Sequence, residues 1–575
     1  MFKVKSFDGI HPNPLMYRKD YIILDGIWDF FMDYNNTGEI RGYQKFFPVG
    51  VTINVPYSYL SESSGIHIKD KCDHVWYHRT IEYTPDKNFR TFIHFEGSDN
   101  VTKLYINGKY VGKDRGGYHR ISFDITDYLK DGTNDITVKC NDNMSVLKPR
   151  GKQRFRKENF WCWYEETTGI WKSVWLEKRT NKYIESFKIT PSFKNKSFNI
   201  ELLSNDVIDD LSIKLSYKEK VVQELNNLKS DTRSISIDLS VLDEFHPWET
   251  LNPELYDLEL ILNSEYGTDT VLSYAGLRDI TISSGKIYLN DKELYQKLIL
   301  DQGYIEHGDM TLTKDELEND IKSMIDMGFN GARKHQKFEA EIFYSLADFY
   351  GYLIWAEMPS MYLTTISSGI NFKREWMYIV KQSYNHPSII TYTPFNESWG
   401  IWGIDHKDPL TRLFVNQVYK MTKAYDKMRP VTTNDGWSHM NSDIITLHLY
   451  NQDKESFKYD IDRAFNENFV NYKKGRIFVL RKEYLLNKPV LLDEFGGTSF
   501  VEDKETFGYG ESVKNLEEFK ERLKALFGTI LDDDRFQGYC YTQLSDVRQE
   551  MNGLYTMDRK IKVPNEIMKE IQRSN

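Results

Sequence analysis

The sequence predicts a three-domain protein in which two β-sandwiches precede a (β/α)8 TIM barrel. Three observations support this prediction. The 575 residues exceed what one hydrophobic core usually serves. Up to about residue 285, short alternating stretches are separated by turn residues. After about residue 286 the pattern changes to strands followed by stretches of helical length, which is typical of β/α units.

Residues 1–180 have the pattern of an all-β domain. Stretches such as Thr91–Glu96 and Asp135–Cys140 alternate apolar and polar residues, and turn residues recur about every ten positions. The pair Asn107 and Gly108 is a strong hairpin signal, because a type I′ turn requires positive φ at both central residues. The spacing fits a β-sandwich or a jelly roll.

Residues 181–285 continue this largely alternating pattern. Examples are Phe198–Leu203 and Tyr256–Leu262. This length and pattern favour a second, smaller sandwich of immunoglobulin size.

Residues 286–575 contain eight candidate strands, at 294–300, 329–334, 352–357, 389–395, 430–434, 444–449, 489–493 and 537–542. Amphipathic stretches such as Lys314–Met327 and Val513–Leu526 lie between several of them, with apolar residues at spacings of three and four. Eight β/α units in this length predict a TIM barrel.

Composition limits the function classes. The net charge is −10 and no Lys/Arg block stands out, which argues against a nucleic acid or an anionic membrane as partner. The amino-terminal residues lack the apolar core of a signal peptide, and nowhere do 18 apolar residues run together, so we expect a cytoplasmic protein without an anchor. Four cysteines without metal-ligand or disulfide spacing predict reduced thiols; they are Cys72, Cys140, Cys162 and Cys540.

Two glutamates occupy equivalent positions at the ends of predicted strands. Glu397 lies in the segment Thr393–Gly400 after strand 4, and Glu494 lies in Leu491–Gly497 after strand 7. Active sites of TIM barrels form at the carboxyl ends of the strands, so both carboxylates should face one site. A pair of carboxylates is the minimal equipment for cleaving a glycosidic bond. The alternative is that both are ordinary polar loop residues.

Nearly the whole chain resembles glycoside hydrolase family 2, the family of β-galactosidases and β-glucuronidases. The motifs that carry the resemblance occur in the family's order: Leu24–Phe30, Trp76–Thr80, Arg115–Tyr118, Thr168–Trp171, Gly328–His335 and the two glutamate segments. The resemblance implies that Glu397 is the general acid/base and Glu494 the nucleophile of a retaining enzyme. Such a mechanism needs carboxyl groups about 5–5.5 Å apart.

The resemblance also implies helpers around this pair. Asn396 would bond the sugar 2-hydroxyl, Tyr450 would orient Glu494, and Asp301 and His335 would bind remote hydroxyls, although His335 could be a structural histidine. Trp163, Trp399 and Trp437 are candidates for stacking on a sugar face, with a core role as the alternative. The predicted substrate-binding residues are Asp301, His335, Asn396, Trp399, Trp437, His448, Tyr450, Glu550 and Asn552.

The substrate prediction depends on one departure from the family. Its β-glucuronidases carry an Asn-x-Lys motif before the segment matched here by Gly553–Thr556, and that lysine meets the sugar carboxylate. This sequence has Glu550 and Asn552 at those positions, which favours a neutral sugar and an exo-acting enzyme like a β-galactosidase. Arg333 or Arg548 could still supply the charge, so a β-glucuronidase or another uronidase stays the alternative.

Two further alternatives use the same scaffold: a carbohydrate-binding protein without turnover, and a transglycosylase. No metal-ligand spacing or cofactor motif occurs, so the sequence predicts neither a metal nor a cofactor. The expected partner is a carbohydrate or glycoside substrate, and a homo-oligomer is possible.

Overall fold

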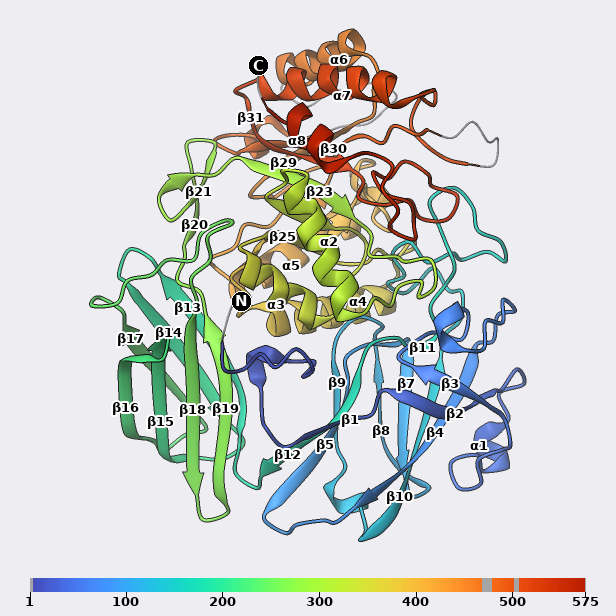
Figure 1. Cartoon of the computed structure of the whole chain (residues 1–575), viewed down its shortest axis with the longest axis vertical. Helices are drawn as coiled ribbons and strands as arrows, with labels where there is room; N and C mark the ends of the chain where they lie inside the picture. The colour runs from blue at the N-terminus through green and yellow to red at the C-terminus, as the bar shows by residue number, and fades with distance from the viewer. Residues whose placement is uncertain (1–3, 468–477, 501–505, 574–575) are drawn as a thin grey trace.

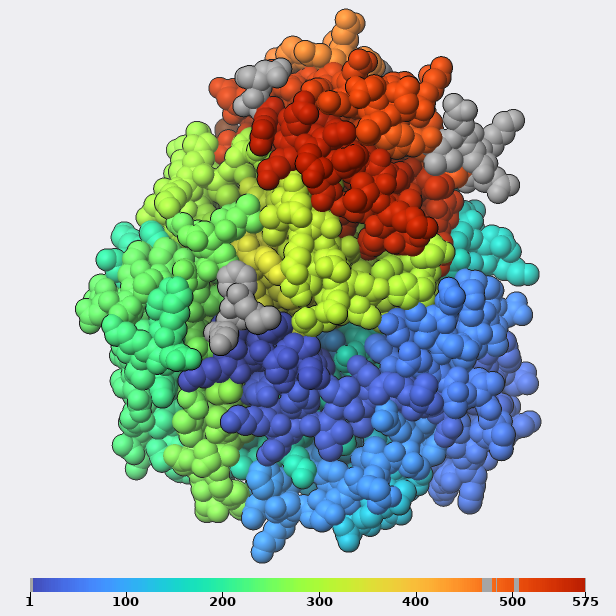
Figure 2. All heavy atoms as spheres, viewed as in Figure 1, coloured from blue at the N-terminus to red at the C-terminus, as the bar shows by residue number. Residues whose placement is uncertain are grey.

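The computed structural model describes residues 4–467, 478–500 and 506–573. Two β-sandwiches lie side by side, and a barrel of strands and helices packs against both (Figure 1). The space-filling view shows the amino-terminal segment lying between the two sandwiches, below the barrel (Figure 2). None of the helices in the described part combines the length and apolarity needed to cross a lipid bilayer.

The first sandwich contains a four-stranded sheet of order β1-β12-β5-β9 and a six-stranded sheet of order β3-β2-β4-β10-β7-β8, joined by the short pair β6 and β11. Its strands are β1 (Tyr21–Ile23), β2 (Gly26–Met32), β3 (Val51–Val55), β4 (His74–Tyr83), β5 (Phe89–Phe95), β6 (Ser98–Asp99), β7 (Val101–Ile106), β8 (Lys109–Arg115), β9 (Ile121–Asp124), β10 (Gly132–Asn141), β11 (Gly169–Ile170) and β12 (Val174–Thr180). The predicted hairpin is confirmed, because Asn107 and Gly108 both have positive φ and join β7 to β8.

The second sandwich pairs a three-stranded sheet with a four-stranded one around its own apolar core. Its strands are β13 (Ile184–Ser192), β14 (Ser197–Ser204), β15 (Ile208–Tyr217), β16 (Lys220–Ser230), β17 (Ser234–Ser240), β18 (Tyr256–Ser264) and β19 (Gly267–Ala275). A small sheet of β20 (Ile280–Ser283), β21 (Lys286–Leu289) and β22 (Lys292–Glu293) leads into the barrel.

Seven parallel strands of the barrel form one sheet of order β26-β25-β24-β23-β31-β30-β29. Their bounds are β23 (Gln296–Asp301), β24 (Gly331–Lys334), β25 (Leu353–Glu357), β26 (Ile389–Thr393), β29 (Ile445–Leu449), β30 (Val490–Gly496) and β31 (Phe536–Thr542). The helices are α2 (Lys314–Asp326), α3 (Glu341–Tyr350), α4 (Ile366–Ser383), α5 (Pro409–Tyr425), α6 (Lys454–Asn466), α7 (Leu516–Leu531) and α8 (Asn565–Ile571). The predicted barrel class is thus confirmed.

The fifth strand is shorter than predicted. An isolated parallel bridge joins Val431 to Tyr392 of β26, and β28 (Asn434–Asp435) pairs with β27 (Phe395–Asn396), which continues β26. No helix separates β28 from β29 in the described residues 436–444. Here side chains accept hydrogen bonds from backbone N–H groups. The N–H of Val431 donates to the Asp443 carboxylate, and the N–H of Thr433 donates to the Ser442 hydroxyl. A regular strand is therefore not needed to satisfy these groups.

Candidate active site

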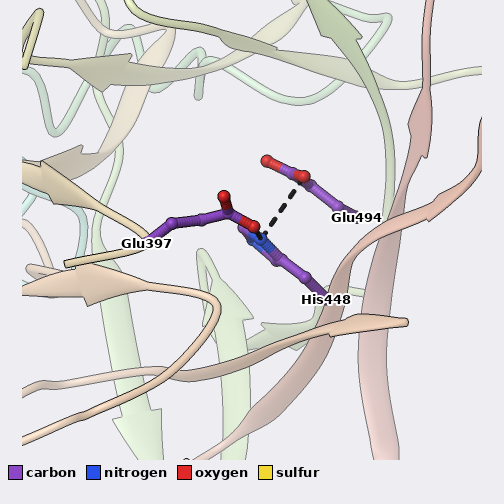
Figure 3. Close-up of side chains that lie close together, drawn as sticks. All are labelled: Glu397, His448 and Glu494. Atoms are coloured by element: carbon purple, nitrogen blue, oxygen red, sulfur yellow. Dashed lines mark hydrogen bonds and ion pairs between the residues drawn. The ribbon is translucent and has the colours of Figure 1, made fainter. Parts of the chain in front are cut away.

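Glu397 and Glu494 reach one site from different strands of the barrel. Glu397 follows β27 and Glu494 lies within β30. One carboxylate oxygen of each glutamate and one ring nitrogen of His448 lie within 4.8 Å of one another, and Figure 3 shows the three side chains converging. This separation is well short of the roughly 6.5–9.5 Å between the carboxyl groups of inverting enzymes, and it agrees with the roughly 5–5.5 Å that the direct attack of a retaining mechanism needs.

The backbone at Glu397 is in the left-handed region, with φ of 51°, and Ser398 follows with φ of 60°. Such conformations cost about 1–3 kcal/mol for a residue other than glycine. Hydrogen bonds offset this cost: the Glu397 N–H donates to the Asp435 carbonyl at 2.9 Å, and the Ser398 N–H donates to the Asn434 side chain at 2.9 Å. The short pair β27 and β28 thus fixes the direction of the Glu397 side chain.

Glu494 is surrounded by donors. Arg333 Nη1 lies 2.9 Å from one carboxylate oxygen, while the Tyr450 hydroxyl donates to the other at 2.5 Å, so the contact predicted for Tyr450 is present. Burial opposes ionisation of Glu494, but the charges of His448 and Arg333 outweigh it and lower the pKa to about 2. Glu494 is therefore an anion at neutral pH, as a nucleophile must be.

His448 connects the two glutamates. Its Nδ1 lies 2.9 Å from Glu397 Oε1 and 3.3 Å from Glu494 Oε2, and its Nε2 lies 3.2 Å from Asp435 Oδ2. Burial lowers the pKa of this imidazole, yet Glu494 and Asp435 together raise it to about 10. His448 is thus a cation between three carboxylates.

Arg333 joins the remaining acids from inside the barrel. Its guanidinium contacts Glu357 at 2.8 Å and Asp435 at 2.5 Å, and it donates to the Asn396 side chain at 2.7 Å. His335 also lies here, with Nδ1 3.0 Å from Arg333 Nη2. Burial raises the pKa of Asp435, but Arg333 and His448 hold it well below its usual range. We call Arg333, Glu357, Asp435, His448 and Glu494 the carboxylate cluster.

The geometry of this cluster also bears on metal binding. Two triplets of the described residues have ligand atoms close enough for an ion: Glu397, His448 and Glu494, and Asp435, His448 and Asp493. The positive charge that these carboxylates require is already supplied by Arg333, which is fully buried, and by His448. The donor set therefore fits an ion-pair network.

Glu550 and Asn552 form a second polar group beside the glutamate pair. The Tyr164 hydroxyl donates to Glu550, and Asn552 Nδ2 donates to the same carboxylate at 3.3 Å. Gln543 Nε2 holds the Asn552 oxygen at 2.7 Å, and Gln302 Nε2 in turn donates to Gln543 at 2.7 Å. Glu550 is 3 % exposed, and these hydrogen bonds fix the orientation of its carboxylate.

Aromatic rings gather next to Glu397. The rings of Trp163 and Trp399 lie 5.5 Å apart and are tilted by 33°, and Trp163 Nε1 donates to the Tyr362 hydroxyl at 2.5 Å. Trp437 packs edge-on against His448 at 5.6 Å. The predicted stacking residues are thus near the glutamates, with Trp399 and Trp437 less than one tenth exposed.

Asp301 does not join these residues. Its carboxylate pairs with Lys334 Nζ at 2.7 Å, and that ammonium lies over the Phe343 ring of α3, between sheet and helices. The prediction placed Asp301 after a strand ending at 300, whereas β23 continues through Asp301. Because side chains alternate along a strand, Asp301 points outward and Gln302, the next residue, reaches Tyr164 and Glu550.

Several residues of the site were not predicted from the sequence. Glu357 and Asp435 are polar residues at the ends of strands, so the rule that identified Glu397 could have found them. Arg548, considered as a source of positive charge, is paired with Glu165, Glu306 and Asp309. Tyr164, Gln302 and Gln543 carry no sequence signal of their own. The same holds for Tyr509, whose ring stacks on that of Tyr450 at 3.4 Å, and for Lys152, whose ammonium lies over the Trp399 ring.

Family models match three consecutive parts of the chain. Residues 23–180 match the sugar binding domain of glycosyl hydrolases family 2, residues 182–278 match the model described as glycosyl hydrolases family 2, and residues 280–574 match the family's TIM barrel domain.

Curated relatives carry two kinds of name. A putative beta-glucuronidase of Formosa agariphila is 25 % identical over 78 % of this chain and 54 % of its own length. A beta-galactosidase of Clostridium acetobutylicum is 24 % identical over 60 % of this chain and 38 % of its own. A beta-glucuronidase of Streptococcus agalactiae is 22 % identical over 96 % and 95 %. This chain thus spans about half of the length of the first of these relatives and less than half of the length of the second.

Among solved structures, the β-glucuronidase from Ruminococcus gnavus in complex with D-glucuronic acid superimposes with a TM-score of 0.80. The alignment covers 100 % of both chains at 20 % identity. At this identity the likeness shows a shared fold.

Proposed function

We propose that this chain, which belongs to glycosyl hydrolases family 2, is a retaining, exo-acting β-glycosidase that prefers a β-glucuronide. The observation that carries the retaining mechanism is the approach of the Glu397 and Glu494 carboxylates to within 4.8 Å.

In the first step Glu494 attacks the anomeric carbon while Glu397 gives its proton to the departing glycosidic oxygen. The bond to the leaving group breaks as the ester to Glu494 forms. In the second step Glu397 takes a proton from water while the water oxygen attacks the anomeric carbon. The ester bond to Glu494 breaks, and the sugar is released with its original configuration. Arg333 and His448 keep Glu494 anionic before each cycle, and Asn396 lies beside it to contact the substrate.

Support for a glucuronide comes from how the relatives match. The Streptococcus agalactiae beta-glucuronidase corresponds to this chain over nearly its full length, whereas the Clostridium acetobutylicum beta-galactosidase does so over 38 % of its own. The chain also shares its fold with the Ruminococcus gnavus enzyme over the whole of both chains, which agrees with a glucuronide substrate.

A second candidate, hydrolysis of a neutral β-galactoside, is favoured by Glu550. This fixed carboxylate and Asn552 stand where the family's β-glucuronidases carry Asn and Lys, and they could accept and donate hydrogen bonds to sugar hydroxyls.

A panel of nitrophenyl β-glucuronide, β-galactoside, β-glucoside, β-mannoside and α-L-arabinoside tests the proposal through kcat/KM. The highest value should be that of the glucuronide. A neutral glycoside in first place would overturn the sugar assignment in favour of the second candidate. Binding without turnover of any of them would overturn the enzyme mechanism, and disaccharide products in place of free sugar would identify a transglycosylase.

A further inference from the structure

A loop of the first sandwich brings a lysine to the catalytic residues of the barrel. Lys152 lies between β10 and β11, and its side chain is 7 % exposed. The ammonium lies 5.0 Å from the centre of the Trp399 ring, two residues beyond Glu397. Burying a charged group costs free energy unless an opposite charge or hydrogen bonds compensate for the lost water.

The backbone around Lys152 is held firmly against the barrel. The N–H groups of Arg150 and Gly151 donate to the Ser360 carbonyl at 2.9 and 3.1 Å, and the Tyr362 hydroxyl donates to the Gly151 carbonyl. Gly151 has φ of +59°, and a Cβ there would lie 2.1 Å from the Gln336 carbonyl oxygen, so only glycine permits this approach. The position of Lys152 is therefore set by contact between the two domains.

Among the residues that the structure describes, no carboxylate lies within ion-pair distance of the Lys152 ammonium. The other cations near the site differ: Arg333 pairs with four acids, Arg548 with three, and Lys334 with Asp301 and Glu339. Glu550 is held by Tyr164 and Asn552.

Lys152 is nevertheless close enough to the site to respond to its charges. Burial lowers the pKa of Lys152, but Cys162 and the carboxylates of Glu550, Glu494 and Glu397 outweigh burial and raise it. The ammonium is thus charged, and it lies between the Trp399 ring and the Cys162 thiol, within range of the charges of the three glutamates.

We propose that the Lys152 ammonium receives the carboxylate of a uronic acid substrate, in place of the lysine that this chain replaces by Asn552. The inference rests on the proposed function and names its specificity-determining residue. A charged hydrogen bond between ammonium and carboxylate favours the anionic sugar over a neutral one of the same shape. It also offsets the repulsion between that sugar and Glu550.

The test compares Lys152→Gln with the wild type on nitrophenyl β-glucuronide and nitrophenyl β-glucoside, which differ only in the group at C6. We expect kcat/KM for the glucuronide to fall about 10- to 100-fold, the size of a lost charged hydrogen bond, with little change for the glucoside. Lys157→Gln, on the exposed part of the same loop, is the matched control and should change neither value.

Two further variants guard against a folding defect. Lys152→Arg should keep most of the glucuronide preference, and Lys152→Gln combined with Asn552→Lys should restore it by returning a cation to the family's position. If the wild type prefers the glucuronide and Lys152→Gln keeps that preference, the proposed role of Lys152 is wrong but the proposed function stands. A wild type that prefers neutral sugars would overturn the proposed sugar and this inference together. Equal losses on both substrates would identify Lys152 as a structural residue.

Discussion

The carboxylate cluster and the first-sandwich loop that carries Lys152 hold their side chains in different ways. In the cluster, Arg333, Asp435, His448 and Glu494 come from strand ends and are bound to one another by charged contacts of 2.5–3.3 Å. In the loop, Lys152 and Trp163 reach the site from another domain, and their neighbours are mainly aromatic rings. The residues proposed for the chemistry thus belong to the barrel, whereas the residue that we propose selects the substrate belongs to a loop of the first sandwich. Substitutions in the cluster should therefore change the rate on every substrate, and substitutions in the loop should change the ranking of substrates.

The largest effect should come from Glu494→Gln. Loss of the nucleophile removes the covalent step, so kcat should fall on the order of 10⁴-fold or more on every glycoside. Added azide should not restore product of retained configuration. Glu517→Gln, on the exposed side of α7, is the control and should behave as wild type. A loss restricted to one sugar would place Glu494 among the selecting residues instead.

Glu397→Gln should have the next largest effect. General acid catalysis contributes roughly 10²–10⁴-fold, so kcat/KM should fall by that factor with leaving groups that need a proton, and much less with a dinitrophenolate. The measurement is kcat/KM across a series of aryl glycosides of differing leaving-group pKa. Equal losses along the series would refute the acid assignment.

His448→Gln should change the pH profile. His448 lowers the pKa of Glu494, so without it that pKa rises, the anion is lost at higher pH, and the acidic limb of kcat/KM moves upward by about 1–3 pH units. His406→Gln, at an exposed position, is the control. An unchanged acidic limb would show that Arg333 alone sets the charge of Glu494.

Trp163→Ala should have the smallest effect and the most selective one. The ring lies beside Trp399, and an aromatic contact contributes about 0.5–1.5 kcal/mol, so KM for aryl leaving groups should rise roughly two- to tenfold. Methyl glycosides, which offer no ring, should be affected less. A similar loss on both kinds of substrate would assign Trp163 to packing between the domains.

The same division explains what could be predicted from the sequence. The eight strands and both glutamates follow from local patterns, because strand ends in a barrel converge whatever the loops do. Asp301 was misplaced by an error of one residue in the end of β23, which is enough to reverse the side to which a side chain points. Lys152 could not be predicted, since its place depends on how the first sandwich docks on Ser360 and Tyr362 of the barrel. The short length of the fifth strand could not be predicted either. The side chains of Asp443 and Ser442 accept hydrogen bonds from its N–H groups, and these contacts have no local sequence pattern.

Glu397 and Glu494 are close enough for double displacement, and the configuration of the first product distinguishes that mechanism from inversion. Proton NMR of a nitrophenyl β-glycoside during its first minutes of hydrolysis distinguishes the anomers before mutarotation mixes them. The spacing within 4.8 Å predicts that the β-anomer of the free sugar appears first and the α-anomer only later. Initial release of the α-anomer would demonstrate inversion and contradict the assignment of Glu494 as a nucleophile.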